Sequence, residues 1–302
     1  MRALALVVVA LALVPAASAG GDFVDLAVSG DTAWFVGSFG IRSISAGSPP
    51  TTALPASAAA QLSVAVAGGA VWVASVANGF VDGRLTRLDP ATGHGRVVLH
   101  VPQGSVLAVA GGGGGSVYAL VGRASGNLVV QLTAGGRVAR RWQVVDAGRL
   151  AADASGCWVS TDHRLLHIRP DGTVVTVLEA AQLGDVATGQ GAVWLPQTDA
   201  ITRVDERTGV IRTVRAPDLH LGGFQHDVAV GAAALWTLDA ARPALQRRSR
   251  ATGRIARTVR LPGIPDAVVA TPGAVWVGIA VTHQVLRFDP ATLRRTLAVT
   301  VS

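Results

Sequence analysis

The segment Gln61–Gly104 contains the runs QLSVAVAGG, AVWVASV, GRLTRLDPATG and HGRVVLHVPQG in that order. Each run is a short apolar or alternating stretch bounded by Gly, Pro, Asp or Asn, which is the pattern of successive strands joined by tight turns. We therefore expect four antiparallel strands here, named A to D in chain order. Strand A is almost entirely Val and Ala, which suits a crowded position covered on both faces.

The tryptophan of the second run recurs along the chain in similar short apolar segments. Tyr118, in SVYAL, occupies the one missing place, and neighbouring aromatic residues are 36 to 46 residues apart. Such a period is typical of propeller blades. The sequence predicts an all-β, seven-bladed β-propeller of four-stranded antiparallel blades, with a large ring in the wedge between blades. The tryptophans that recur in this setting are Trp34, Trp72, Trp158, Trp194, Trp236 and Trp276.

A repeated turn motif separates the expected strands C and D. It reads LDPATG at Leu88–Gly93, VDERTG at Val204–Gly209, SRATG at Ser249–Gly253 and FDPATL at Phe288–Leu293. Asp starts the turn through a side-chain bond to nearby backbone, and Gly supplies the left-handed position. Leu293 replaces Gly in the last copy, so we expect that turn to differ slightly.

The N-terminus has the pattern of a secretory signal. Arg2 precedes an apolar run from Ala3 to Val14, and the small residues Ala17-Ser18-Ala19 follow. The run is too short to span a bilayer comfortably, and no later segment has the length of a membrane span. We expect residues 1–19 to be a cleaved signal peptide, residues 20–302 to form one propeller domain, and the product to be secreted or extracytoplasmic.

The position of the first and last strands bears on how the ring closes. The chain is expected to enter at strand A of the first blade and to leave through strand D of the seventh. No blade would then be shared between the termini, and closure would depend on face-to-face packing of the two end blades. Cys157 is the only cysteine, so no internal disulfide can form, and its setting predicts a small buried hydrophobe.

All 26 basic residues are Arg, and the formal net charge is +7. Attraction to polyanions, such as an anionic envelope polymer, is one consequence. The alternative is that Arg in outer strands discourages edge-to-edge aggregation. No aromatic residues are interleaved with the basic ones, which argues against nucleic-acid binding. The densest basic cluster is Arg242, Arg247, Arg248, Arg250, Arg254, Arg257 and Arg260.

The repeats GAVWVAS, GAVWLPQTDAITRVDERTG and GAVWVGIAVTHQVLRFDPATL resemble the YVTN/NHL-like propellers, particularly the streptogramin B lyase-like group. The resemblance covers essentially the whole mature chain. It implies seven blades with a ligand site at the mouth of the central channel. It also implies catalytic roles for His226, at the start of an inner strand, and Asp239, three places after its Trp, near a magnesium ion.

Positions nine residues before each Trp are equivalent and should form a ring at one end of the channel. They are Asp25, Ser63, Arg149, Asp185, Asp227 and Ala267, with Val106 expected in the third repeat. Loops between strands B and C open on the same face and bring His163 and His283. Such a mouth suits a small polar ligand, a protein partner, or magnesium or calcium. The predicted ligand-binding residues are Asp25, Arg149, Asp185, Asp227, Asp266, His163 and His283.

The alternative for these aspartates is that each binds its own backbone at a strand start. No zinc spacing, nucleophile elbow or phosphate-cradling loop is present. Neither Glu179 nor Glu206 occupies the place three residues after a Trp. The sequence thus favours a ligand-binding or interaction scaffold without a complete catalytic set. A metal-assisted lyase or hydrolase acting at the channel mouth remains the alternative.

Overall fold

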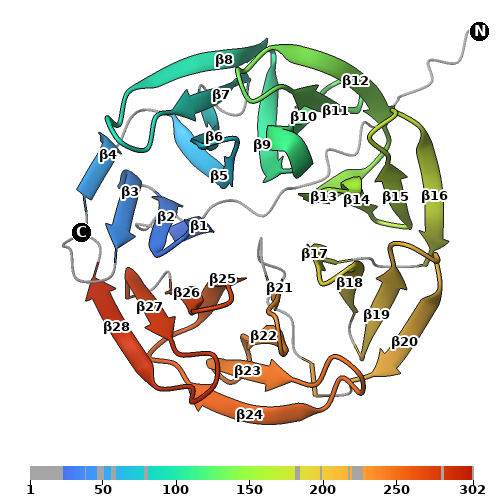
Figure 1. Ribbon diagram of the computed structural model, residues 1–302. Coiled ribbons are helices and arrows are strands. Elements are labelled where there is room, and N and C mark those ends of the chain that lie inside the picture. Colours follow the sequence, from blue (N-terminus) through green and yellow to red (C-terminus); the bar gives the residue numbers. More distant parts are fainter. Residues whose placement is uncertain are drawn as a thin grey trace, which may run out of the picture.

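Seven four-stranded antiparallel sheets are arranged around a central axis in the computed structural model of the chain (Figure 1). The structure describes residues 23–37, 39–45, 51–55, 59–77, 81–180, 184–197, 199–216, 218–219, 227–279 and 282–300. The predicted signal peptide lies outside these residues. The fold is an all-β seven-bladed propeller, as predicted, and blades 1 to 7 are numbered in chain order.

The first four blades each consist of consecutive strands, with strand A innermost. Blade 1 contains β1 (Phe23–Ser29), β2 (Thr32–Gly37), β3 (Gly40–Ser45) and β4 (Thr51–Pro55). Blade 2 contains β5 (Ala60–Ala67), β6 (Ala70–Ala77), β7 (Asp82–Leu88) and β8 (Gly95–Pro102). Blade 3 contains β9 (Gly104–Gly111), the short 3₁₀ helix η1 (Gly113–Gly115), β10 (Val117–Arg123), β11 (Asn127–Leu132) and β12 (Val138–Val144). Blade 4 contains β13 (Ala147–Asp153), β14 (Gly156–Thr161), β15 (Arg164–Ile168) and β16 (Val174–Glu179).

The remaining three blades repeat this order. Blade 5 contains β17 (Ala187–Gly189), β18 (Ala192–Gln197), β19 (Ala200–Asp205) and β20 (Ile211–Arg215). Blade 6 contains β21 (Val228–Val230), β22 (Leu235–Asp239), β23 (Ala244–Arg248) and β24 (Ile255–Arg260). Blade 7 contains β25 (Pro265–Ala270), β26 (Val275–Ile279), β27 (Gln284–Phe288) and β28 (Arg295–Thr300). The described residues include no helix long and apolar enough to cross a bilayer.

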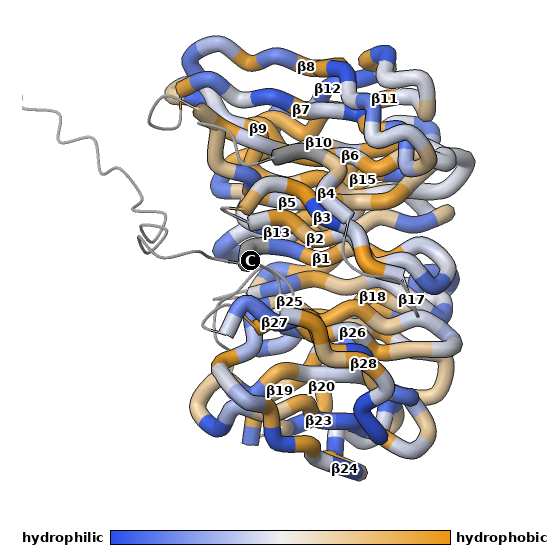
Figure 2. The backbone as a smooth tube through the Cα atoms, turned by 90° about the vertical axis from the view of Figure 1, so that its left-hand side faces the viewer, coloured by the Kyte–Doolittle hydropathy of each residue, from blue (hydrophilic) through white to orange (hydrophobic). Residues whose placement is uncertain are grey.

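The aromatic residue of each strand B packs against the following blade. Trp34, for example, lies in one buried cluster with Val64 and Val73 of blade 2. Tyr118 fills the corresponding place in blade 3 and contacts blade 4 residues such as Leu150. Burial of these large rings supplies much of the apolar area that joins one blade to the next. In the view from the side, hydrophobic segments run through the interior of the disc (Figure 2).

The ring closes without a shared blade. The order β1-β2-β3-β4 and the order β25-β26-β27-β28 belong to separate sheets. Trp276 of blade 7 is buried in one cluster with Leu26 and Phe35 of blade 1. The prediction of closure by face-to-face packing is therefore confirmed.

In blades 1, 2, 4 and 7, strand A has an irregularity in register just before the ring position. The ring positions of these blades are Asp25, Ser63, Arg149 and Ala267. In blade 3 the expectation was wrong. Tyr118 pairs with Ala110, as Trp72 pairs with Ala65, so Ala108 and not Val106 is equivalent to Ser63. The glycine-rich turn before β10 adds one residue to the repeat, so the ring position lies ten residues before Tyr118, whereas Val106 lies twelve before it.

The turns between strands C and D form as expected, with one difference. Asp89 Oδ1 accepts hydrogen bonds from the amides of Ala91 and Thr92, at 2.8 and 3.1 Å. Leu293 adopts a left-handed φ of 60°, close to the 70° of Gly93, and its amide makes the same bond back to the first residue of the turn. The expectation that this turn differs is wrong, because burial of the Leu293 side chain offsets its conformational cost.

Candidate functional site at the channel mouth

The inner strands of all seven blades enclose a cavity of about 270 Å³ along the axis. Its walls are made of Val, Ala and Leu side chains, and Thr188 is the one polar side chain among the lining residues. The channel itself is therefore apolar. Groups able to bind a polar ligand lie at its ends, on the ring positions and the adjoining loops.

Three ring positions hold neighbouring blades together. Asp25 is fully buried; its Oδ1 accepts the amide of Leu26 at 2.6 Å and its Oδ2 accepts the amide of Val64, in blade 2, at 2.7 Å. Asp185 repeats this arrangement, with the amides of Val186 at 2.8 Å and of Val228, in blade 6, at 3.3 Å.

Ser63 makes the neutral version of the same contact. Its Oγ accepts the amide of Val109, in blade 3, at 3.2 Å. In blades 1, 2 and 5, the side chain at the ring position thus accepts a hydrogen bond from the inner strand of the next blade. The alternative considered from sequence, that the aspartates bind their own backbone, holds for Asp25 and Asp185, and each also bridges to the following blade.

The other predicted ring residues lie where the repeat places them. Asp227 and Asp266 are buried at the starts of the inner strands of blades 6 and 7. The Asp227 carbonyl accepts the amide of Leu238 at 3.0 Å. Arg149 is half-buried and donates from Nη1 to the Gly148 carbonyl at 3.0 Å. Ligand binding by these groups stays a prediction.

The predicted histidines are less uniform in their surroundings. His163 is exposed in the loop between β14 and β15, and its amide donates to Thr161 Oγ1 at 3.2 Å. His283 is half-buried in the loop between β26 and β27 and has a left-handed φ of 50°. His226 lies outside the described residues. Among the described residues, no three His, Cys, Asp or Glu side chains are close enough to hold a metal ion. A magnesium or calcium ion at the mouth therefore stays a prediction that a metal titration would test.

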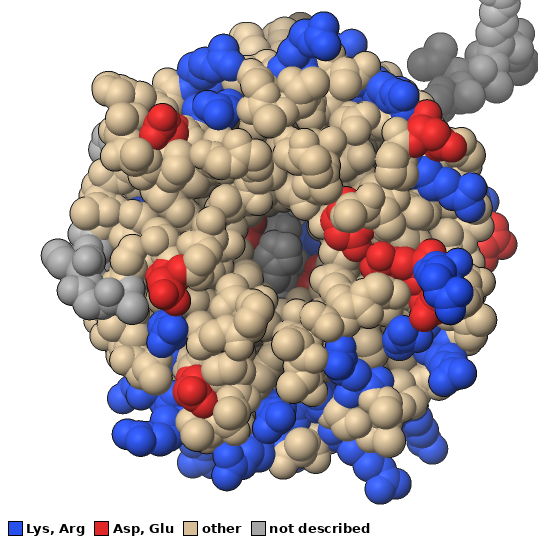
Figure 3. Space-filling model, viewed as in Figure 1, with Lys and Arg blue, Asp and Glu red and all other residues tan. Residues whose placement is uncertain are grey.

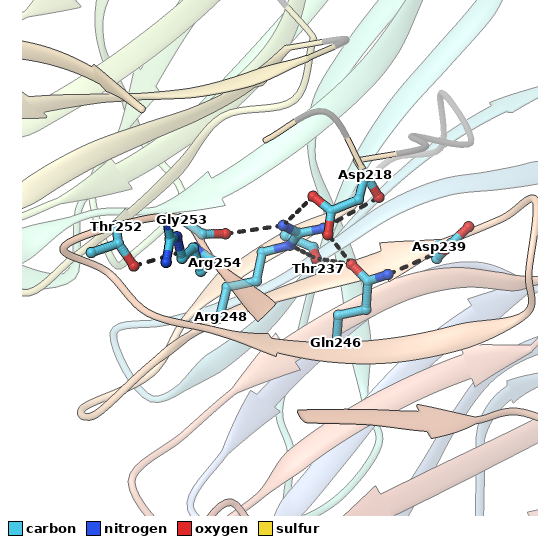
Figure 4. A network of polar contacts seen from close by, with 8 residues as sticks. All are labelled: Asp218, Thr237, Asp239, Gln246, Arg248, Thr252, Gly253 and Arg254. Atoms are coloured by element: carbon cyan, nitrogen blue, oxygen red, sulfur yellow. Dashed lines mark hydrogen bonds and ion pairs between the residues drawn. The ribbon is translucent and has the colours of Figure 1, made fainter. Parts of the chain in front are cut away.

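Asp239, the second predicted catalytic residue, is buried and hydrogen bonded on both oxygens. Its Oδ1 accepts the amide of Arg242 at 3.0 Å, and its Oδ2 accepts Gln246 Nε2 at 3.2 Å. Through Gln246 it belongs to a network centred on Arg248 (Figure 4). These contacts position Asp239 as a member of a polar network within blade 6.

Arg248 has no exposed surface, although it belongs to the densest basic cluster of the sequence. Its Nε donates to Thr237 Oγ1 at 2.9 Å, and its Nη1 donates to Asp218 Oδ1 at 3.1 Å and to the Gly253 carbonyl at 3.0 Å. A buried guanidinium requires such partners. The alternation of side chains along a strand could have indicated that Arg248 is buried, because it lies on the same face of β23 as Ala244 and Gln246.

Cross-strand partners of the aromatic residues form a second set that the sequence analysis missed. The guanidinium carbons of Arg87, Arg203 and Arg287 lie 5.6 to 6.0 Å from the centres of the indole rings beside them. In blade 4, His167 instead stacks on Trp158 with ring centres 3.8 Å apart. Burial lowers the pKa of His167, which favours its neutral form.

Glu206 forms an acidic pair with Asp153 on the opposite face of the propeller. Burial and the neighbouring Asp153 raise the pKa of Glu206 to about 7. Its Oε1 is buried and has no hydrogen-bond partner in the described part of the chain. Asp153 Oδ1 in turn accepts the amide and the hydroxyl of Ser155, at 2.8 and 2.6 Å. No sequence signal connects Asp153 with Glu206, since they come from different repeats.

Exposed arginines gather on the outer strands and turns of blades 5 to 7. Figure 3 shows them along the side of the disc that carries β20, β24 and β28. In the described part of the chain, no carboxylate lies within ion-pair distance of them. We call this set the cationic edge: Arg207, Arg212, Arg215, Arg242, Arg254, Arg257, Arg260, Arg294 and Arg295.

The fold is that of a seven-bladed propeller. Comparisons with known proteins find matches among solved structures. Neither a family model nor a curated protein sequence matches the chain. A catalytically inactive virginiamycin B lyase from Staphylococcus aureus, solved with quinupristin, matches with 16% identity and a TM-score of 0.62, covering 81% of this chain and 85% of that one. The fold resemblance inferred from the repeats is thereby confirmed.

Propellers with other roles match as well. The WD40 propeller domain of Doa1 has 14% identity and a TM-score of 0.68, covering 88% of this chain and 92% of that one. A chain of a nidogen/laminin complex has 9% identity and a TM-score of 0.55, covering 89% and 92%. At these identities the likeness shows the fold alone, which hosts both enzymes and interaction scaffolds.

Proposed function

We propose that this protein is a secreted binding propeller without catalysis, whose cationic edge binds an anionic polymer of the cell envelope. The observation that carries the proposal is the set of nine exposed guanidiniums on three neighbouring blades, without carboxylate partners among the described residues. Small polar ligands or a protein partner at the channel mouth would use a separate surface.

Charge distribution supports an edge site. Residues 185–302 contain 14 of the 26 arginines and nine of the 19 acidic residues. Four of those acids, Asp185, Asp227, Asp239 and Asp266, are buried. The surface of blades 5 to 7 is therefore more cationic than the sequence count suggests. Guanidinium groups keep their charge at any ordinary pH, so attraction for a polyanion would persist across the physiological range.

The surroundings of the predicted catalytic groups also favour binding over catalysis. A general base needs an accessible atom within reach of a substrate proton. Asp239 borders a cavity of about 310 Å³, but both its oxygens already accept hydrogen bonds within blade 6, and both oxygens of the ring residue Asp25 accept backbone amides. These groups stabilise the scaffold in their present arrangement.

The test is binding of a fluorescent polyphosphate chain at low and moderate salt. Combined substitution of Arg254, Arg257 and Arg260 by Gln should weaken binding by about tenfold or more, and added salt should weaken the wild-type complex. The matched control substitutes Arg123, Arg137 and Arg141 of blade 3, which are also exposed. Equal losses in the two variants, or affinity that ignores salt, would refute a localised edge.

A lyase or hydrolase that uses the channel mouth is the competing function. Its test is turnover of a cyclic depsipeptide with magnesium added, comparing the wild type with His226→Ala and Asp239→Asn. Activity that disappears in both folded variants would establish the enzyme and end the proposal of a pure scaffold. Secretion is tested separately, by sequencing the N-terminus of the exported protein, which should begin at Gly20.

A further inference from the structure

Blades 2, 5, 6 and 7 each pair an arginine of strand C with the tryptophan of strand B, and blade 6 differs from the other three in its turn between strands C and D. In blades 2, 5 and 7 the turn begins with Asp89, Asp205 and Asp289, and each carboxylate accepts amides further along its turn. In blade 6 the same position is Ser249, whose Oγ accepts the amides of Ala251 and Thr252, both at 3.3 Å. Blade 6 thus keeps the hydrogen bonds from the turn amides to the first side chain of the turn, but it lacks the negative charge.

An arginine precedes each of these turns by two residues, and in blade 5 it forms an ion pair with the turn aspartate. Arg203 pairs with Asp205 at 3.1 Å while lying over Trp194. Arg247 is the equivalent residue of blade 6, paired across the strands with Trp236. No acid at the turn balances it, and a further cation, Arg250, follows Ser249 directly.

Arg247 and Arg250 are both half-buried. In the described part of the chain neither side chain makes a hydrogen bond or an ion pair. Both guanidiniums therefore keep their donors available, and a charged donor pair of this kind forms strong hydrogen bonds with an external anion. Arg248, between them in sequence, cannot serve, because its guanidinium is bonded on the other face of the sheet.

A cavity of about 450 Å³ lies against this turn. Its walls combine the cations with small side chains, which leaves room for an anionic group. Ser249 still has its hydroxyl proton to donate, because Oγ acts as acceptor toward the turn amides. The lining residues are Ala233, Ala234, Arg247, Arg248, Ser249, Arg250, Ala251 and Ala256.

We propose that the turn between strands C and D of blade 6 is an oxyanion site, in which Arg247, Arg250 and the Ser249 hydroxyl bind one phosphate or carboxylate group in place of the missing aspartate. This inference deepens the proposed function, because phosphate or carboxylate groups repeat along an anionic polymer. It rests on the proposed function only for the identification of that polymer as the source of the anion. The site itself requires no polymer.

The experiment titrates inorganic phosphate into the full chain by calorimetry at constant ionic strength. The test variant, Ser249→Asp, supplies the acid that blades 2, 5 and 7 already have, so it should fold. Thr258→Asp is the matched control, since it adds the same charge to an exposed position of β24 in the same blade. A parallel titration with citrate asks whether carboxylates replace phosphate.

Saturable binding is expected for the wild type and for Thr258→Asp, with affinities within about twofold of each other. Ser249→Asp should bind about tenfold more weakly or not at all, a change of ~1.4 kcal/mol, and its melting temperature should no longer rise with phosphate. Absence of saturable binding to the wild type, or equal losses in the two variants, would overturn the site. Binding of phosphate without binding of polyphosphate would support the site and refute the proposed function. Binding of polyphosphate without saturable binding of phosphate would support the proposed function and refute the site.

Discussion

The Oδ2 atom of Asp25 accepts a hydrogen bond from the amide of Val64 at 2.7 Å, although the two residues belong to different blades. The same carboxylate accepts the amide of Leu26 within its own strand, at 2.6 Å. A charged acceptor shared by two inner strands fixes the spacing between blades 1 and 2 at the axis. The aspartate that the repeat pattern suggested as a ligand-binding group thus has a demonstrable role in blade assembly.

Substitution of Asp25 by Asn should destabilise the protein by about 1–3 kcal/mol, because an NH₂ group would face one of two buried amides. Urea unfolding of the purified variant measures this. Ser63→Ala, at the equivalent neutral position, should cost about 1 kcal/mol. An Asp25→Asn protein with the wild-type midpoint would show that the inter-blade bond contributes little.

Replacement of Arg248 by Met should cost about 3–5 kcal/mol, since it removes the donors on which Thr237 and Gln246 depend. Thermal unfolding is the measurement, and the near-ultraviolet circular dichroism of the tryptophans reports on the packing. Arg254→Met, on the exposed edge, should change stability by less than about 0.5 kcal/mol. Similar melting temperatures for the two variants would contradict the network's importance.

Stability should fall as pH rises from about 5 toward 8, owing to Glu206. Its pKa in the folded protein is raised to about 7 by burial and by Asp153, so the folded state holds a proton that the unfolded chain releases at lower pH. The protonated Glu206 contributes its full stabilisation at a pH below the pKa of Glu206 in the unfolded chain. This contribution is lost as the pH rises through the pKa of Glu206 in the folded protein. Glu206→Gln should remove this component, which partial exposure limits to about 1 kcal/mol.

The measurement is the difference in unfolding free energy between pH 5 and pH 8 for the wild type and for Glu206→Gln. Glu179→Gln is the control, because Glu179 is exposed on β16. If Glu206→Gln keeps the full pH dependence of the wild type, the raised pKa does not contribute to stability.

Substitution of Leu293 by Gly should destabilise the last turn in spite of its left-handed backbone. Relief of the φ of 60° gains about 1 kcal/mol, whereas the buried side chain contributes about 1.5–3 kcal/mol and Gly also loses more entropy on folding. The expected net loss is about 1–2 kcal/mol in chemical denaturation. A more stable Leu293→Gly variant would show that strain outweighs packing at this position.

Much of the propeller was predictable because it depends on local pattern. The recurring Trp and the Asp-to-Gly turns specify strands, turns and their order, and all seven blades follow. The error at Ala108 arose where a glycine-rich turn changed the repeat length, since nothing in a run of glycines says how many residues the turn absorbs. The candidate site was less predictable. Equivalent positions could be counted, but their hydrogen-bond partners could not.

What the sequence determined by itself was the number of blades, the order of their strands and the ring residues of every blade except blade 3, because a period of about forty residues is a property of the chain alone. Only the tertiary structure decided what those residues do. Asp25 meets Val64, Arg248 meets Asp218 and Glu206 lies beside Asp153 because neighbouring sheets face each other at a definite angle and distance. Contacts between repeats depend on that geometry, which no single repeat specifies.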